Sequence, residues 1–179
     1  KDMEVYGLNR VKNGNLIYTL YSAHRWQIIE VNSSGEKISG IAVERYPLFV
    51  SKISESSYLV AKWKGPRSTY EWGSLIEVDK NGKTTYKHSI KIGEKGKENI
   101  LDVGFINNFR ILSEKNILVS TYCGFGNSQR YRKGVVAEIT RKGAESNKVI
   151  YDIVWKYEDP GEVWDADKLP DGEFLVLTS

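Results

Sequence analysis

Cationic and aromatic side chains occur together in three segments of this chain, and their types suit the binding of an anion or a flat ring. Arg and Lys hold sulfate, phosphate or carboxylate groups through charge-assisted hydrogen bonds. Tyr and Trp offer flat faces on which a sugar or a phenol can stack. We therefore predict a ligand-binding surface from these segments: His24, Arg25, Trp26, Lys62, Trp63, Lys64, Arg67, Tyr70, Trp72, Arg130, Tyr131 and Arg132.

These residues also have a simpler interpretation. The cations would then be ordinary solvated loop residues, and the aromatics would pack between neighbouring sheets. Under the binding interpretation, the partner is an anionic or aromatic small molecule, a glycan or another protein. The net charge of +3 is small, so a nucleic-acid partner is not expected.

A nucleophilic imidazole would add catalysis to binding, and the chain holds two histidines. His88 falls in an expected outer strand, where a side chain usually faces solvent or a neighbouring sheet. His24 lies in an expected loop beside Arg25 and is the better placed of the two. The sequence leaves a catalytic residue unassigned.

Metal and cofactor chemistry has little support in this sequence. Asp165, Asp167 and Asp171 resemble a loose calcium-binding run, but the downstream Glu that such a loop requires is missing. Cys123 is the single cysteine, which excludes an internal disulfide and a cysteine-based metal cluster. We predict neither a metal ion nor a cofactor.

The elements that must position the loops follow from an internal repeat. One eight-residue pattern occurs four times without gaps, beginning at Val11, Ile53, Leu112 and Leu169. A second pattern places a Gly five residues after a Glu, in the pairs Glu30 and Gly35, Glu77 and Gly82, and Glu138 and Gly143. Each Gly is predicted to lie in a tight turn that needs a positive φ. A whole repeat therefore corresponds to two hairpins, or four strands.

Short alternating runs rich in Val, Ile, Tyr and Trp predict an all-β fold. Antiparallel four-stranded units that repeat at about 40–50 residues are typical of a β-propeller. The predicted strands are 5–11, 16–22, 25–31, 37–45, 48–53, 57–62, 73–79, 84–92, 103–112, 116–122, 134–140, 148–157, 163–169 and 173–178.

These strands group into three blades and half of a fourth, at 1–47, 48–100, 101–161 and 162–179. We expect them to belong to a larger ring of about six to eight blades, and a ring closed by two copies of the chain is the alternative. In such blades the short turns lie on one face, where we expect structural roles. The long loops with the cations and aromatics lie on the other face, where binding usually resides.

Three segments together resemble a known repeat. They read EVWDADKLPDGEFLV at 162–176, IEVDKNG at 76–82 and IVW at 153–155, and they are similar to the strand–turn and hairpin of arylsulfotransferase-type propellers. The resemblance spans nearly the whole chain. It implies a propeller outside the cytoplasm and, in the enzymes of that family, sulfuryl transfer between phenols through a covalent histidine. Where the family often has His before Asp-Ala, this chain has Trp164.

We expect a non-catalytic binding or scaffold module that works outside the cytoplasm through its aromatic-basic loops. The alternative is an aryl sulfotransferase whose catalytic histidine lies outside this segment. A quinone- or metal-dependent propeller enzyme is disfavoured, because the sequence lacks the ligands. No run approaches the roughly 18 apolar residues of a membrane-spanning helix, so no membrane span is expected in this segment.

Overall fold

Strands supply the regular structure of this protein, and none of the described residues is helical. The computed structural model describes residues 3–11, 13–44, 46–62, 74–92, 99–102, 106–121, 134–159, 161 and 163–178. Every predicted strand is present and begins at most three residues from its predicted start, and the all-β prediction is confirmed. A further short strand, β9 (Asn99–Asp102), is additional to the predicted set.

The first four strands form an antiparallel sheet in the order β1-β2-β3-β4. Their bounds are β1 Glu4–Arg10, β2 Leu16–Ser22, β3 Arg25–Val31 and β4 Lys37–Val43. The β2–β3 connection is a two-residue turn at Ala23 and His24, whose φ angles are 50° and 63°. The prediction of a long loop here is wrong, because Ser22 and Arg25 pair directly across a turn of the type I′ kind.

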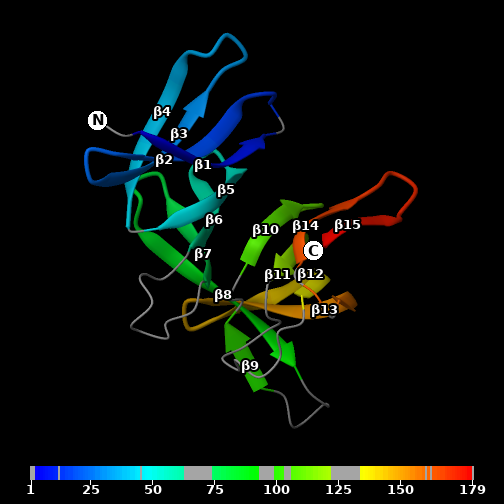
Figure 1. Cartoon of the computed structure of the whole chain (residues 1–179). Helices are drawn as coiled ribbons and strands as arrows, with labels where there is room; N and C mark the ends of the chain where they lie inside the picture. Colours follow the sequence, from blue (N-terminus) through cyan, green and yellow to red (C-terminus); the bar gives the residue numbers. More distant parts are fainter. Residues whose placement is uncertain are drawn as a thin grey trace.

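The next nine strands share one sheet, whose path runs β10-β11-β12-β13-β8-β7-β6-β5 with β9 added on β8. Their remaining bounds are β5 Pro47–Ser54, β6 Ser57–Lys62, β7 Ser74–Asp79, β8 Thr84–Ile92, β10 Ile106–Ile111, β11 Asn116–Thr121, β12 Gly134–Glu145 and β13 Lys148–Asp159. Strands β8 and β13 pair in parallel, and the two ends of the path, β5 and β10, lie against each other. The sheet is therefore nearly closed, like a barrel (Figure 1).

The parallel pairing depends on a hairpin that the sequence did not predict. A turn was expected at Gly143, but β12 continues through it to Glu145, and Gly143 pairs with Ile150 next to a register shift. The chain instead turns at Ser146 and Asn147, whose φ angles of 44° and 66° fit a two-residue turn of the type I′ kind. The longer hairpin lets the start of β13 reach β8.

Two last strands, β14 (Val163–Lys168) and β15 (Phe174–Thr178), form a two-stranded sheet. This sheet lies against β10 and β11, at the end of the molecule opposite the first sheet (Figure 1).

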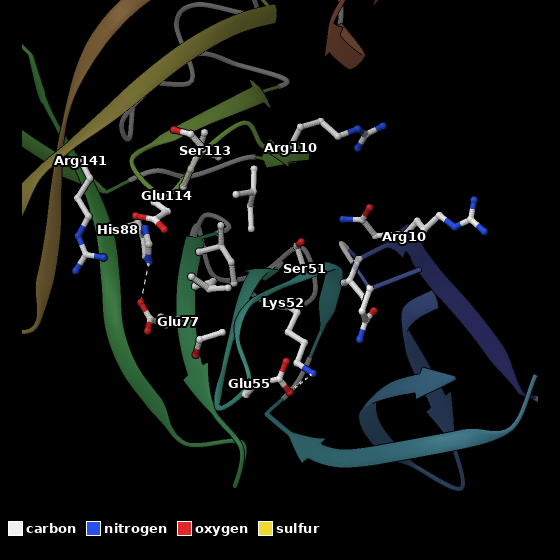
Figure 2. A pocket seen from close by; sticks show the side chains of 18 of the residues that line it. Arg10, Ser51, Lys52, Glu55, Glu77, His88, Arg110, Ser113, Glu114 and Arg141 are labelled. Carbon is white, nitrogen blue, oxygen red and sulfur yellow. Dashed lines mark hydrogen bonds and ion pairs between the residues drawn. The ribbon is translucent and has the colours of Figure 1, made fainter. Parts of the chain in front are cut away.

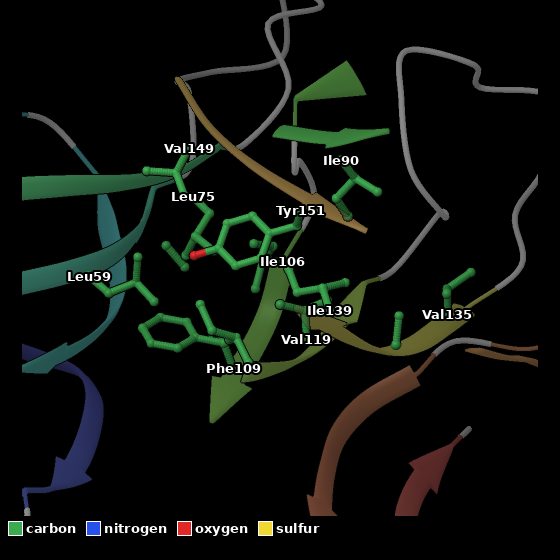
Figure 3. Close-up of a cluster of buried hydrophobic side chains, with 13 residues drawn as sticks. Leu59, Leu75, Ile90, Ile106, Phe109, Val119, Val135, Ile139, Val149 and Tyr151 are labelled. Atoms are coloured by element: carbon green, nitrogen blue, oxygen red, sulfur yellow. The ribbon is translucent and has the colours of Figure 1, made fainter. Parts of the chain in front are cut away.

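Alternation along the central strands divides the core into three clusters. In β6, Leu59 and Ala61 face the interior of the large sheet, while Tyr58 and Val60 pack toward the first sheet. In β11, Val119 faces the interior, and Leu118 packs toward β14 and β15. Because successive side chains of a strand point to opposite faces, central strands such as β6 and β11 are buried on both faces. Figure 3 shows the interior cluster, in which Tyr151 contributes one of the few polar atoms.

No helix long and apolar enough to cross a membrane occurs in the part of the chain that the structure describes.

Candidate functional site

A buried carboxylate recurs at the repeat position of Glu30. The Glu30 side chain on β3 is 2% exposed. It accepts a hydrogen bond from Asn15 Nδ2 at 2.8 Å and forms an ion pair with Lys52 Nζ at 3.3 Å. Lys52 lies on β5, so this contact ties the first sheet to the next one. Burial raises the pKa of Glu30, but the hydrogen bonds from Asn15 and Lys52 outweigh burial and leave the pKa below its usual value.

The same arrangement is present two repeats later. Asn116 Nδ2 donates to Glu138 Oε1 at 2.8 Å, and Lys168 Nζ lies 2.7 Å from Glu138 Oε2. Lys168 belongs to β14, so this contact ties the large sheet to the last one. We call each set of Asn, Glu and Lys a clamp.

The lysine of each clamp is the residue just before the eight-residue pattern of the following copy. That residue is basic in three of the four copies and apolar in the third copy. The strand register confirms the equivalence, because these four residues pair in the same way with the next strand: Arg10 with Leu16, Lys52 with Tyr58, Ile111 with Ile117, and Lys168 with Phe174.

The middle copy, centred on Glu77, has no clamp. Ser57 stands where the other copies have Asn, and Ile111 stands where they have Lys. Among the described residues, the nearest charged or titratable partner of the Glu77 carboxylate is His88, whose Nε2 lies 4.0 Å from Oε2. That separation is too long for a hydrogen bond. Glu77 is therefore the one copy of this carboxylate without a hydrogen-bond donor in the part of the chain described.

A cavity of about 510 Å³ opens at this unclamped copy. It lies where the carboxyl ends of β1, β5 and β10 meet, beside the short turns that follow them. Its charged and titratable lining residues are Arg10, Lys52, Glu55, Glu77, His88, Arg110, Glu114, Arg141 and Tyr151. Figure 2 shows His88 of β8 turned toward Glu77 of β7, with Lys52 and Glu55 meeting on the β5 side. The volume falls within the range of small-molecule sites.

His88 and Tyr151 form a buried polar pair in this lining. His88 is 3% exposed, and its Nδ1 lies 2.9 Å from the Tyr151 hydroxyl. Its Nε2 is buried and has no hydrogen-bond partner among the residues that the structure describes. Burial, and then the nearby charge of Arg141, lowers the pKa of His88 to about 3. Burial also raises the pKa of Tyr151. Both side chains are therefore neutral near pH 7.

The cations of the lining differ in how far they are already engaged. Lys52 is held by Glu30 and Glu55. Arg110 NH2 lies 3.1 Å from Asp165 Oδ2. The Arg141 side chain forms no hydrogen bond or ion pair with any described residue and is exposed. Figure 2 shows Arg10 and Arg110 extending away from His88.

Four of the predicted binding residues are described. His24 is exposed, with its Nδ1 3.3 Å from the Tyr21 hydroxyl. Arg25 is exposed. Trp26 packs against an aromatic cluster, with ring centroids 4.8 to 5.7 Å away: Tyr6, Tyr21 and Tyr46. Lys62 Nζ pairs with Glu44 Oε2 at 2.6 Å.

The other eight predicted residues lie outside the described part of the chain: Trp63, Lys64, Arg67, Tyr70, Trp72, Arg130, Tyr131 and Arg132. The binding surface on the long loops therefore stays a prediction. Cys123 lies outside the described residues as well. Among those that are described, no group of three or more His, Cys, Asp or Glu could hold a metal ion.

Sequence reasoning missed the cavity, since it assigned only structural roles to the short turns. A signal was nevertheless present in the repeat. All three copies have the Glu, but only the first and third also have an Asn at the fifth position of the pattern and a Lys just before the pattern of the following copy. The middle copy has Ser57 and Ile111 at these two positions.

The chain matches no protein-family model and no curated protein. It is similar to a solved structure, the crystal structure of a protein of unknown function from Bacteroides caccae. The two are 16% identical with a TM-score of 0.42, and the match covers 88% of this chain and 68% of the other.

Proposed function

We propose that this protein is a non-catalytic binding module that takes a small polar ligand in the cavity between β5, β8 and β10. The observation that carries the proposal is the His88 Nε2 atom, which is buried without a hydrogen-bond partner among the described residues, in the lining of a cavity of about 510 Å³. Leaving a buried polar atom unsatisfied costs about 1–3 kcal/mol. A ligand atom that completes this hydrogen bond would recover that cost.

The protonation states favour binding over acid–base catalysis. A general base works best when its pKa lies near the working pH. The pKa of His88 is about 3, and that of Tyr151 is raised above its usual value. Neither group exchanges a proton readily near pH 7, but each can form a hydrogen bond with a fixed partner. His88, which is buried with a lowered pKa, is therefore not an accessible, activated imidazole for sulfuryl transfer.

We also propose that the units β1–β4, β5–β8, β10–β13 and β14–β15 correspond to blades of a β-propeller related to the arylsulfotransferase type, working outside the cytoplasm. The face-to-face packing of the first sheet on β6 and β7, and of β14 and β15 on β11 and β12, supports the blades. An experimental structure in which β1, β5, β10 and β14 do not surround a common axis would contradict the fold. Recovery of the protein in the cytoplasmic fraction of its source cells would contradict the location.

The binding proposal is tested with a panel of small charged fragments. The panel contains butylammonium, butanoate, butyl sulfate and phenyl sulfate, and the readout is the imidazole ¹⁵N resonances of His88. At least one member is expected to shift these resonances in a saturable way. The matched variant Ile111→Trp, which fills the cavity with an uncharged side chain, should abolish the shift. No response to any member would overturn the proposal, and turnover of phenyl sulfate would replace it with the enzyme alternative.

A further inference from the structure

We propose that the ligand of this cavity carries a primary ammonium group, which binds Glu77 in place of the lysine that this copy of the clamp lacks. The inference rests on the proposed function of the cavity and adds the chemical class of its ligand. It rests on a comparison of the Glu77 copy of the repeat with the copies that contain Glu30 and Glu138.

The two complete clamps show what a carboxylate at this repeat position binds. Glu30 and Glu138 each accept one hydrogen bond from an Asn amide at 2.8 Å. Each also lies within 3.3 Å of a lysine ammonium that comes from the following sheet. The partners are an amide nitrogen and an ammonium nitrogen in both copies.

The middle copy keeps the carboxylate and loses both partners. Ile111 is shorter than lysine and carries no charge, and Ser57 is shorter than asparagine. Glu77, whose side chain is 15% exposed, and Ile111 both line the cavity. A carboxylate largely removed from water is costly unless it is paired. A cationic ligand would supply that pairing.

His88 gives this position a second acceptor. The 4.0 Å between His88 Nε2 and Glu77 Oε2 lets one nitrogen lie about 2.9 Å from both atoms, which is the usual N–H···O and N–H···N distance. In this proposal, neutral His88 has the tautomer that donates its Nδ1–H to the Tyr151 oxygen, which leaves a lone pair on Nε2. An ammonium nitrogen has three donors and no acceptor, so it can satisfy both acceptors at once.

The neighbouring charges do not reverse this preference, because Lys52 and Arg110 are paired with carboxylates and Arg10 extends away from His88. An anionic group at the same point would meet the like charge of Glu77. Arg141 is the cation whose charge acts on His88, but its side chain is exposed, so solvent screens its repulsion of an ammonium group. Glu114 in the lining adds a further negative charge.

The test uses butylammonium and its uncharged analogue butanol, titrated against the His88 ¹⁵N resonances. Wild-type protein is expected to bind butylammonium in a saturable way and butanol at least tenfold more weakly. Glu77→Gln keeps the shape and removes the charge, and should weaken butylammonium binding at least tenfold. Glu138→Gln is the matched control, because it removes the same carboxylate from a complete clamp outside the cavity; its affinity should equal that of wild type.

Ile111→Lys provides a second, independent arm. It restores the basic residue at the register position of Lys52 and Lys168. The new lysine should form an ion pair with Glu77 and so abolish butylammonium binding. It should raise the melting temperature when Glu77 is present and lower it in the Glu77→Gln background. Equal binding of butanol, or unchanged binding in Glu77→Gln, would overturn the inference.

Binding of the anionic fragments without butylammonium would overturn this inference and leave the cavity as a ligand site. A panel without any response would remove the proposed function itself.

Discussion

A single repeat position, that of Glu30, Glu77 and Glu138, shows how two substitutions change what a carboxylate can do. In the clamps, Asn and Lys close the carboxylate off, and its role is to join two sheets. At Glu77 the same backbone position opens into a cavity beside a neutral buried imidazole. The middle copy differs from the two clamps in two side chains, Ser57 and Ile111.

His88 should make the stability of the protein depend on pH. Its pKa is about 3 in the folded protein because of burial and Arg141, against about 6.5 when unfolded. As the pH falls below about 6.5, the unfolded chain binds a proton that the folded protein does not, so stability is lost down to about pH 3. Between pH 7 and pH 5 we expect a loss of up to about 2 kcal/mol from this residue.

The measurement is urea unfolding of wild type and His88→Leu at several pH values. The other titrating groups are common to both proteins, so the difference between the two slopes isolates His88. Parallel curves for the two proteins across this interval would show that His88 is not buried in its neutral form.

At the scale of the elements, the residues of the hairpin turns determined which of the turn predictions were confirmed. The strands followed from alternation, because a half-buried strand shows its period of two directly in the sequence. The turns at Gly35 and Gly82 were confirmed, with φ angles of 81° and 80°. The turn at Gly143 was wrong, since Ser146 and Asn147 supply a two-residue turn farther along. The candidate site could not be read in this way, because Tyr151 meets His88 only through the parallel pairing of β13 with β8.

The two confirmed glycine turns differ in one respect that can be measured. A Cβ at Gly35 would meet nothing within 4 Å, whereas a Cβ at Gly82 would lie 1.9 Å from the carbonyl oxygen of Ala42 on the first sheet. Gly35→Ala should therefore cost only the strain of a positive φ, about 1–2 kcal/mol. Gly82→Ala should cost that strain and the loss of close packing between two sheets, roughly 1–3 kcal/mol more.

Unfolding free energies of the two alanine variants, measured under identical conditions, decide the matter. Because both turns have nearly the same φ, the backbone term cancels in the difference. Equal losses of stability would mean that the first sheet does not lie as close to the β7–β8 turn as the structure has it.

For the whole molecule, the clamps and the cavity alternate along the chain. One clamp joins the first sheet to β5, and the other joins β12 to β14. The region between them is held by the interior apolar cluster and by the β8–β13 pairing, and it contains the cavity. The sheets on both sides of the cavity give its polar lining a rigid support, which favours a preformed site.

This arrangement predicts an uneven stability across the molecule. A two-stranded sheet is marginal by itself, and β15 contributes no fully buried residue, while β11 is buried along nearly its whole length. The β14–β15 sheet depends on a small apolar cluster and on the contacts of Lys168 with Glu138 and of Arg110 with Asp165. We expect its amides to exchange with solvent through local opening, well before those of β11 and β12.

Native-state hydrogen exchange of Glu138→Gln tests that dependence. Because the variant releases Lys168, exchange in β14 and β15 should accelerate about tenfold or more, which corresponds to roughly 1.4 kcal/mol. Glu30→Gln disrupts the equivalent clamp on the first sheet and should leave exchange in β14 and β15 unchanged. If Glu138→Gln instead accelerated exchange equally in every sheet, the last sheet would unfold only with the whole protein, and the clamp would be a determinant of global stability rather than a local anchor.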